Sequence, residues 1–188
     1  TAVGYTALLN NTTGTQNVAL GANALDANTT ASFNTAIGYG SLGSNTTGGN
    51  NTAVGRDSLT ANTTGLFNTA IGDKAADSNT TGNNNTAIGY NALNSNTTGS
   101  QNTALGLGAL NANVTGSQNT AVGRLALQNS TGGSNVALGH LAGDNITSGE
   151  NNIVIGTSAD ASSATVDNEV TLGDSNIATL RCNVQTIS

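Results

Sequence analysis

The chain has 188 residues, a formal net charge of −6 and 7% charged residues, against about 25% charged residues in an ordinary soluble domain. Asn, Thr, Ala, Gly and Ser make up 127 of the 188 residues, and two Phe with three Tyr are too few for a conventional globular core. Four Lys and Arg residues cannot neutralise a row of phosphates, and no apolar run reaches the ~20 residues of a membrane helix. We therefore expect neither nucleic-acid binding nor membrane insertion.

A 17-residue repeat runs along the chain from its first residues. It begins with Asn-Thr-Ala, an aliphatic residue and Gly, and it continues through Ala-Leu or Ser-Leu to Asn-Thr-Thr-Gly. The motif glycines are Gly4, Gly21, Gly38, Gly55, Gly72, Gly89, Gly106, Gly123, Gly139, Gly156 and, in a degenerate copy, Gly173. One step, from Gly123 to Gly139, has 16 residues, and we place the shortfall between Leu127 and Asn129. Such regularity argues against disorder and predicts a repeat architecture.

Each repeat fits one coil with two short extended segments joined by turns. The first segment is Thr-Ala-Ile at residues 35–37, and the second centres on Ala92-Leu93. Helical spacing is absent, while Asn, Thr and Gly favour turns. Stacked coils would pair their strands in parallel and satisfy the backbone hydrogen bonds. We therefore predict an all-β fold, a parallel β-roll or β-solenoid that forms a rod of roughly 50 Å at ~4.8 Å per coil.

Equivalent residues of successive coils form columns. Two neighbouring coils supply the structural set Asn34, Ala36, Ile37, Gly38, Leu42, Asn51, Ala53, Val54, Gly55 and Leu59. We expect the asparagine amides to bond from coil to coil and the aliphatic and Leu columns to point inward with Thr. By strand alternation, the Ala column then points to the other face. Because about two buried aliphatic side chains per coil stabilise a coil only weakly, we expect identical chains to cover the Ala face.

Large residues gather at two variable places of the coil. The place directly after the motif glycine holds all three tyrosines and the only histidine, and both phenylalanines share a place just before the Asn column. Such residues must project into solvent at an edge, and Tyr and Arg are favoured at recognition surfaces. The candidates for receptor contact are Tyr5, Phe33, Tyr39, Arg56, Phe67, Lys74, Tyr90, Arg124 and His140. The alternative is that these edges are simply unconstrained.

No combination of residues in the sequence predicts catalysis. His140 and Cys182 lie in different regions, and Asp73 and Asp77 beside Lys74 are expected to be solvated turn charges. We expect no enzymatic activity, no cofactor and no metal site, because neither a catalytic dyad nor a calcium-binding repeat is present. The lone Cys182 is either a buried thiol or meets its copies across a threefold axis.

The regularity weakens after Gly156. Residues 157–167 are rich in Ser, Ala and Asp and lack the Leu of the repeat, and the aliphatic residues that follow are spread over longer intervals. We therefore divide the chain into a shaft, residues 1–156, and a C-terminal stem, residues 157–188, in which the chains of an oligomer intertwine.

The repeat resembles those of two families. Residues 17–21, Asn-Val-Ala-Leu-Gly, resemble the Ser-Val-Ala-Ile-Gly repeat of trimeric autotransporter adhesin heads, which are left-handed parallel β-rolls of three chains. Residues 85–93, Asn-Thr-Ala-Ile-Gly-Tyr-Asn-Ala-Leu, are similar to bacteriophage tail-fibre repeats. Residues 169–188 are similar to the segment that precedes the self-cleaving chaperone domain of endosialidase-type tailspikes. The resemblance implies an elongated homotrimer in a virion tail fibre, which presents edges to a glycan or protein receptor on the host cell.

Two alternatives stay open. The first is a bacterial surface adhesin or a glycosylated extracellular filament, because Asn45-Thr46-Thr47 matches the acceptor pattern for N-glycosylation. The second is an ice-binding solenoid, because the regular column that includes Thr35, Thr52 and Thr69 could order water. The expectation that these Thr side chains point inward argues against ice binding.

Overall fold

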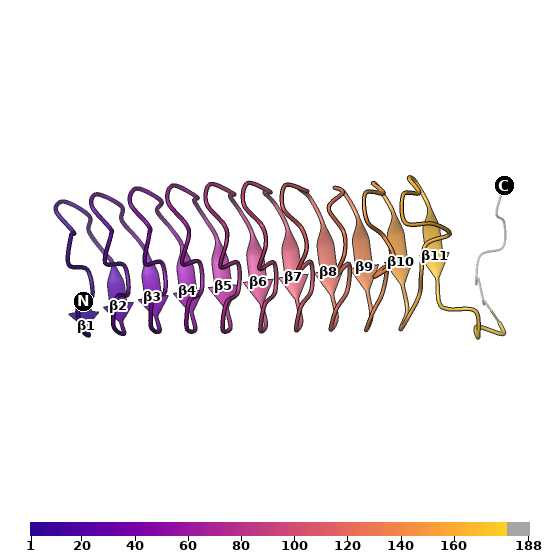
Figure 1. Ribbon diagram of the computed structural model, residues 1–188, viewed down its shortest axis with the longest axis horizontal. Helices are drawn as coiled ribbons and strands as arrows, with labels where there is room; N and C mark the ends of the chain where they lie inside the picture. Colours follow the sequence, from indigo (N-terminus) through magenta and orange to yellow (C-terminus); the bar gives the residue numbers. More distant parts are fainter. Residues whose placement is uncertain (180–188) are drawn as a thin grey trace, which may run out of the picture.

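The computed structural model describes residues 1–179, which form one rod of stacked coils (Figure 1). Each coil contributes one short strand, and the strands form an 11-stranded parallel sheet in sequence order. The strands are β1 (Ala2–Val3), β2 (Val18–Leu20), β3 (Thr35–Ile37), β4 (Thr52–Val54), β5 (Thr69–Ile71), β6 (Thr86–Ile88), β7 (Thr103–Leu105), β8 (Thr120–Val122), β9 (Val136–Leu138), β10 (Ile153–Ile155) and β11 (Val170–Leu172). No helix able to cross a membrane occurs in this part of the chain. The predicted all-β parallel solenoid with 17-residue coils is confirmed.

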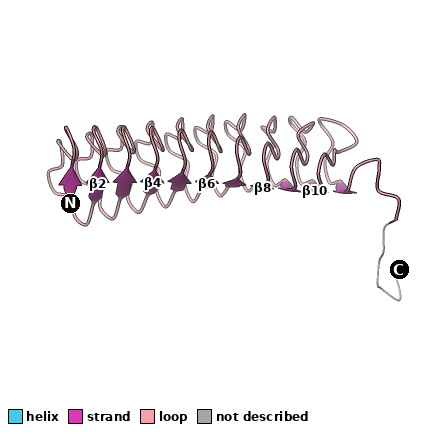
Figure 2. Ribbon diagram, turned by 90° about the horizontal axis from the view of Figure 1, so that it is seen from below, coloured by secondary structure: helices cyan, strands magenta, loops and turns pink. Residues whose placement is uncertain are grey.

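The strand register follows the repeat along the whole row of strands (Figure 2). Thr35 pairs with Thr52, and β8 pairs with β9 at an offset of 16, so that the short coil leaves the sheet in register. The missing residue is absorbed in the loop. Gly132 O accepts a hydrogen bond from Asn119 Nδ2 at 2.9 Å, in the way that the glycine of Asn-Thr-Thr-Gly does in other coils. One Thr of that tetrapeptide is therefore missing, and the predicted place between residues 127 and 129 is wrong.

The second extended segment that we predicted is not a strand. Leu42 and Leu59, which follow Ser in their coils, both have a φ of 51°, in the left-handed region, where an L-residue costs about 1–2 kcal/mol. The segment is a turn that still bonds to the next coil, because Leu42 N donates to Ser58 O at 3.0 Å. Complete burial of the Leu side chains offsets the cost of this backbone conformation.

The two faces of the strands are the reverse of our prediction. Ala36 and Ala53 are completely buried inside the coil together with Leu42, whereas Ile37 and Val54 are only half-buried on the outside. The physical reason is space: one three-residue strand lies so close to the rest of its own coil that the Leu of the opposite turn fills the interior. Only Ala then fits beneath the strand. The Ala column is therefore covered by its own chain and needs no partner.

Two columns of buried asparagines connect the coils. In the predicted column, Asn51 N donates to Asn34 Oδ1 at 2.9 Å, and Asn51 Nδ2 donates to Gly65 O at 2.8 Å. A second column, which we did not predict, is formed by the Asn of Asn-Thr-Thr. There the amides bond directly to one another, as in Asn62 Nδ2 to Asn45 Oδ1 at 2.8 Å. Both columns remain completely buried through most of the rod, so their hydrogen bonds satisfy amides that water cannot reach.

The motif glycines allow the coils to approach closely. Gly72 has a φ of 133°, and a Cβ atom there would lie 2.6 Å from the carbonyl oxygen of Gly89 in the next coil. A side chain at this place would separate the coils, so the repeat requires glycine. Gly38 and Gly55, which we assigned to the structural set, have the same φ of 133°.

The sheet continues past the predicted boundary at residue 157. β11 pairs with β10 in register, from Ile153 with Val170 to Ile155 with Leu172. Glu169 takes the place of the column asparagine, and its backbone N donates to Asn152 Oδ1 at 2.9 Å. Hydrogen bonds from Ser162 and Thr171 lower the pKa of this carboxylate. Residues 180–188, which include Cys182 and the end of the predicted stem, lie outside the described part of the chain.

Candidate interaction surfaces

The outward face of the sheet is a continuous strip of aliphatic and Thr side chains, which we call the sheet face. No charged residue occurs in β1–β11. Its aliphatic column consists of Val3, Leu20, Ile37, Val54, Ile71, Ile88, Leu105, Val122, Leu138, Ile155 and Leu172. Leu20 and Leu138 leave 47% and 49% of their surface exposed. A contiguous apolar patch of this kind on a single chain is typical of an interaction site.

The second column of the sheet face carries free hydroxyl groups. From β3 to β8 it consists of Thr, and none of these six Oγ1 atoms hydrogen-bonds to another group in residues 1–179. The Thr of the loops behave differently, since Thr46 Oγ1 donates to Thr63 O at 3.1 Å. The Thr hydroxyls of the sheet therefore face outward and are available to water or to a partner.

The composition of the sheet face changes toward its C-terminal end. In β9, β10 and β11 the place of the Thr is taken by Val136, Ile153 and Val170, which are 36%, 39% and 63% exposed. The last three strands thus expose two aliphatic columns in place of one, which makes this end of the strip its most apolar part.

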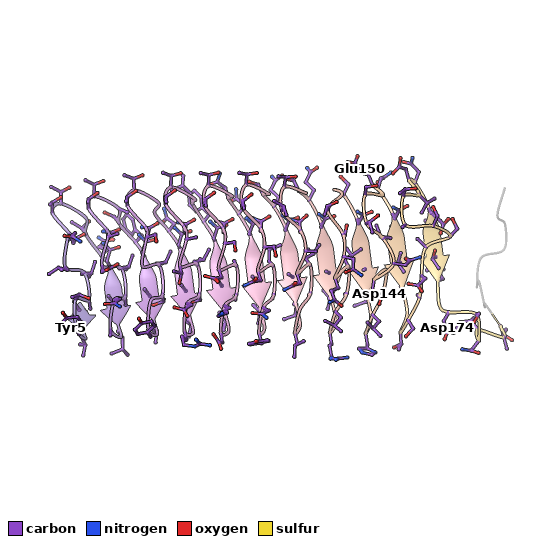
Figure 3. The ribbon with its side chains drawn as sticks, viewed as in Figure 1. Tyr5, Asp144, Glu150 and Asp174 are labelled. Carbon is purple, nitrogen blue, oxygen red and sulfur yellow. The ribbon has the colours of Figure 1, made fainter. Side chains whose placement is uncertain are left out.

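All five aromatic residues of the chain are exposed, in two columns that border the sheet face. Figure 3 shows the two edges of the rod. Tyr5 lies at the lower edge, just beyond β1, and Glu150, which precedes β10, lies at the upper edge. Tyr5, Tyr39 and Tyr90 are 80%, 55% and 51% exposed, and Phe33 and Phe67 are each 56% exposed. The prediction that these residues project at an edge is confirmed, and receptor contact stays a prediction.

The charged residues of the edge contact neighbouring coils. Arg56 donates to Asp73 Oδ2 at 2.8 Å and also lies 3.5 Å from Asp57, and the hydrogen bond and charge of Asp73 raise the pKa of the guanidinium. The guanidinium of Arg124 meets His140 Nε2 at 2.8 Å. Since a guanidinium only donates, the imidazole accepts this hydrogen bond at Nε2.

Lys74 does not belong to the column of the arginines. It occupies the next place along the coil, is half-buried and has a φ of 56°. Of the predicted receptor-contact residues, it is therefore the least suited to reach a partner. In the described part of the chain, no group of three or more His, Cys, Asp and Glu side chains could hold a metal ion.

The Asn of the Asn-Thr-Thr segments is completely buried from Asn28 to Asn96, which leaves no room for a glycan in the folded rod. Asn45 is completely buried, and its Nδ2 donates to Gly48 O at 2.9 Å and to Asn28 Oδ1 at 3.1 Å. A glycan attached to that nitrogen would have to displace the preceding coil. The sequence contained a signal of this burial, because the Asn is kept in seven successive coils, from Asn11 to Asn113.

No protein-family model matches the sequence, and no curated protein or solved structure shows a significant match to the chain. The functional inference therefore depends on the surfaces of this chain itself.

Proposed function

We propose that the chain is a shaft segment of a homotrimeric attachment fibre, of the kind that bacteriophage tail fibres form on the virion. The observation that carries the proposal is the sheet face, which runs from β1 to β11 without a charged residue. In the proposed trimer, the sheet faces of three parallel chains pack around a common axis. The repeat's resemblance to trimeric adhesin heads and phage tail fibres supports three chains.

The physical reason for assembly lies in the half-exposed aliphatic column. Burying apolar surface stabilises by about 25 cal/mol per Å², and the column repeats its contribution in each of eleven strands. Because every coil presents the same pattern, chains side by side in register place aliphatic against aliphatic along the whole rod. The apolar surface buried by one coil stabilises the assembly only slightly, whereas the sum over all coils of the rod supports a stable assembly.

Native mass spectrometry of the full chain tests this assembly. We expect a species of three times 18.4 kDa. Replacing two outward aliphatic residues by charge, Ile71→Asp with Leu105→Asp, should dissociate it, because three carboxylates would meet near the axis at each position. The control is Thr64→Asp with Thr98→Asp, which places the same charges on exposed loop residues. A single-chain mass for the unaltered protein, or an intact trimer in the sheet-face variant, would contradict the proposal.

The proposed contact with a host surface uses the exposed edges. A trimer would present each aromatic edge residue three times, so that weak contacts gain avidity. Replacing Tyr5, Tyr39 and Tyr90 by Ala should then reduce attachment of the fibre to host cells without changing the number of chains in the assembly. A bacterial surface adhesin would use the same edges. The identity of the cells that the protein binds distinguishes such an adhesin from a phage tail fibre.

Ice binding is a second candidate function, because the sheet Thr point outward and not inward as we expected. Their hydroxyls form a regular array with the aliphatic column, at spacings of ~4.8 Å between strands and ~6.6 Å along a strand. The array can order water only if no partner chain covers it. Thermal hysteresis that disappears in Thr86→Tyr and survives in the loop variant Thr81→Tyr, together with a single-chain mass, would favour this function over the trimeric fibre.

A further inference from the structure

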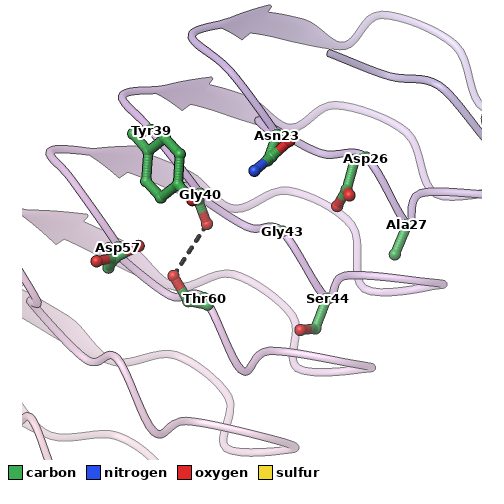
Figure 4. A pocket seen from close by; sticks show the side chains of 9 residues that line it. All are labelled: Asn23, Asp26, Ala27, Tyr39, Gly40, Gly43, Ser44, Asp57 and Thr60. Carbon is green, nitrogen blue, oxygen red and sulfur yellow. Dashed lines mark hydrogen bonds between the residues drawn. The ribbon is translucent and has the colours of Figure 1, made fainter. Parts of the chain in front are cut away.

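A hollow of about 500 Å³ lies beside the sheet face, between the coils that carry β2 and β4 (Figure 4). Its lining comes from three successive coils. The residues that contribute to it are Asn23, Asp26, Ala27, Tyr39, Gly40, Gly43, Ser44, Asp57 and Thr60. The hollow is not part of the sheet face, so packing of the sheets around an axis does not need to cover it.

Two glycines of the middle coil form the hollow. Gly40 and Gly43 are the second and fifth residues after the motif glycine Gly38. In every other coil at least one of these two places carries a side chain, such as Asn23 with Asp26 in the coil before. Only the coil of β3 has glycine at both places, so its backbone forms the floor of the hollow between its neighbours.

The carboxylates of the two neighbouring coils reach over this floor. A Cβ atom on Gly40 would lie 2.6 Å from Asp57 Oδ1, and a Cβ atom on Gly43 would lie 3.7 Å from Asp26 Oδ1. Thr60 Oγ1 donates to Gly40 O at 2.9 Å, so its oxygen can still accept a hydrogen bond from a ligand. The hollow thus offers hydrogen-bond acceptors from the coils on both sides of Gly40 and Gly43.

Tyr39 supplies an apolar wall. In Figure 4 its ring stands at the rim of the hollow near Gly40, and 55% of the residue is exposed. An aromatic face with a carboxylate on either side, a hydroxyl and an amide matches the needs of a sugar ring, which has an apolar C–H face and a rim of hydroxyl donors.

We propose that this hollow binds a neutral pyranose, with the C–H face of the sugar on Tyr39 and its hydroxyls donating to Asp26 and Asp57. We expect a neutral sugar to bind in preference to an acidic one, because Asp26 takes part in no ion pair within residues 1–179 and the chain carries a net charge of −6. The inference deepens the proposed surface-attachment role and rests on it for its biological meaning. The geometry of the hollow itself does not depend on the trimer.

Filling the hollow tests the proposal. Gly40→Asn puts an Asn side chain into the hollow. Other coils already have Asn at this place, Asn23 with a φ of 60° and Asn91 with a φ of 53°, so the altered coil should still fold. The matched control is Gly108→Asn, at the equivalent place of another coil with a φ of 65° compared with 66° at Gly40. Binding of the methyl glycosides of galactose, glucose and mannose, and of glucuronate, is measured by ligand-detected NMR on the full chain.

We expect the unaltered chain and Gly108→Asn to bind at least one neutral glycoside at millimolar concentration, and Gly40→Asn to bind none. Tyr39→Ala should weaken binding by about tenfold. Leu107→Ala, at the same place of a coil in which Asn111 carries a side chain where the hollow has Gly43, should leave binding unchanged, and Leu107 is 45% exposed. Binding that persists in Gly40→Asn, a preference for glucuronate, or no binding of any neutral glycoside by the unaltered chain would overturn the proposal. Native mass spectra of the same samples report separately on the fibre, so failure of one proposal does not imply failure of the other.

Discussion

The coils before and after residue 129 build the same sheet around different interiors. From Asn28 to Asn113, the interior carries an amide column in which each Asn Nδ2 bonds to the preceding Oδ1 at 2.7–3.1 Å. After the short coil, the column continues as Ser130 and Ile146, both completely buried. In the same region Gly143 replaces the core Leu, and a Cβ atom there would lie 3.1–3.6 Å from Leu127, Ile146 and Val154.

The difference shows that the interior needs filled volume and paired polar groups more than it needs a particular residue. Ile146 and Val154 occupy the space that Leu fills elsewhere, so the core stays closed after the amide column ends. The junction is a weak point. Within residues 1–179, Asn113 Oδ1 and Ser130 Oγ are both buried without a hydrogen-bond partner, and each unpaired group costs about 1–3 kcal/mol.

The largest expected effect is at a motif glycine of the regular coils. Gly72→Ala forces a Cβ atom to 2.6 Å from Gly89 O at a φ of 133°, and we expect a loss of at least about 3 kcal/mol in the free energy of unfolding. In the C-terminal coils, Gly143→Ala should lower it by only about 1–2 kcal/mol, because the added Cβ atom meets side chains and not backbone, and Ala76 already holds the equivalent place with a φ of 49°. Urea unfolding followed by circular dichroism measures both, and equal losses would refute the distinction between the two glycines.

The next largest effect is expected in the amide column. Asn79 donates to Asn62 at 2.9 Å and to Gly82 O at 3.1 Å, and it accepts from Asn96 at 2.8 Å. Asn79→Ala should therefore cost about 2–3 kcal/mol of unfolding free energy. Ser130→Ala, at the equivalent place where the hydroxyl has no partner, should be stabilising by about 1 kcal/mol. A destabilised Ser130→Ala protein would mean that the hydroxyl is satisfied in a way that the described contacts do not show.

The two halves of the sheet face should also differ in the proposed assembly. Replacing Val136, Ile153 and Val170 by the Thr of the other coils removes apolar surface from the axis and should weaken the trimer by about 1–2 kcal/mol per chain. The reverse change, Val in place of Thr86, Thr103 and Thr120, should strengthen it by a similar amount. Dissociation temperatures from native mass spectrometry compare the two sets, and an unchanged value in both would place the sheet face away from the interface.

The smallest expected effect is a pH dependence confined to the C-terminal coils. Partial burial, together with the nearby Asp160 carboxylate, raises the pKa of Asp144 above 3.8. The folded state therefore holds this proton more tightly than the unfolded chain, and stability falls as the pH rises from about 3.8 through the raised pKa. Asp144→Asn should remove this fall. The lowered pKa of Glu169 acts in the opposite direction, since its contribution is present above pH 4.5 and is lost as the pH falls through the lowered value.

Hydrogen exchange of the amides in β9–β11, compared with β3–β6 between about pH 3 and pH 7, measures this effect. The Asp144→Asn substitution should change the protection of the amides in β3–β6 only slightly, because Asp144 lies several coils away from them. A uniform response of the whole rod would show that the coils unfold as one unit and that the local assignment is wrong.

The columns of the solenoid were readable from the sequence because stacking repeats every contact. The period of 17, the parallel strands, the column of Asn51 and the exposed aromatic edges all follow from residues that recur at one place. The second buried column at Asn45 was present in the same pattern but was interpreted as a polar turn, because Asn-Thr-Thr-Gly is also typical of exposed loops.

The sequence by itself determined the repeat, the fold class and the residues that share a column. Strand alternation placed Ala36 on the face opposite Thr35 and Ile37, and only the tertiary structure decided which face is inside. The deciding quantity is the width of the coil, which the Leu42 side chain fills from the opposite turn, so the small residue faces inward and the larger ones face out. The hollow at Gly40 and Gly43 depends in the same way on neighbours one coil away, whose carboxylates reach it only after the chain has coiled.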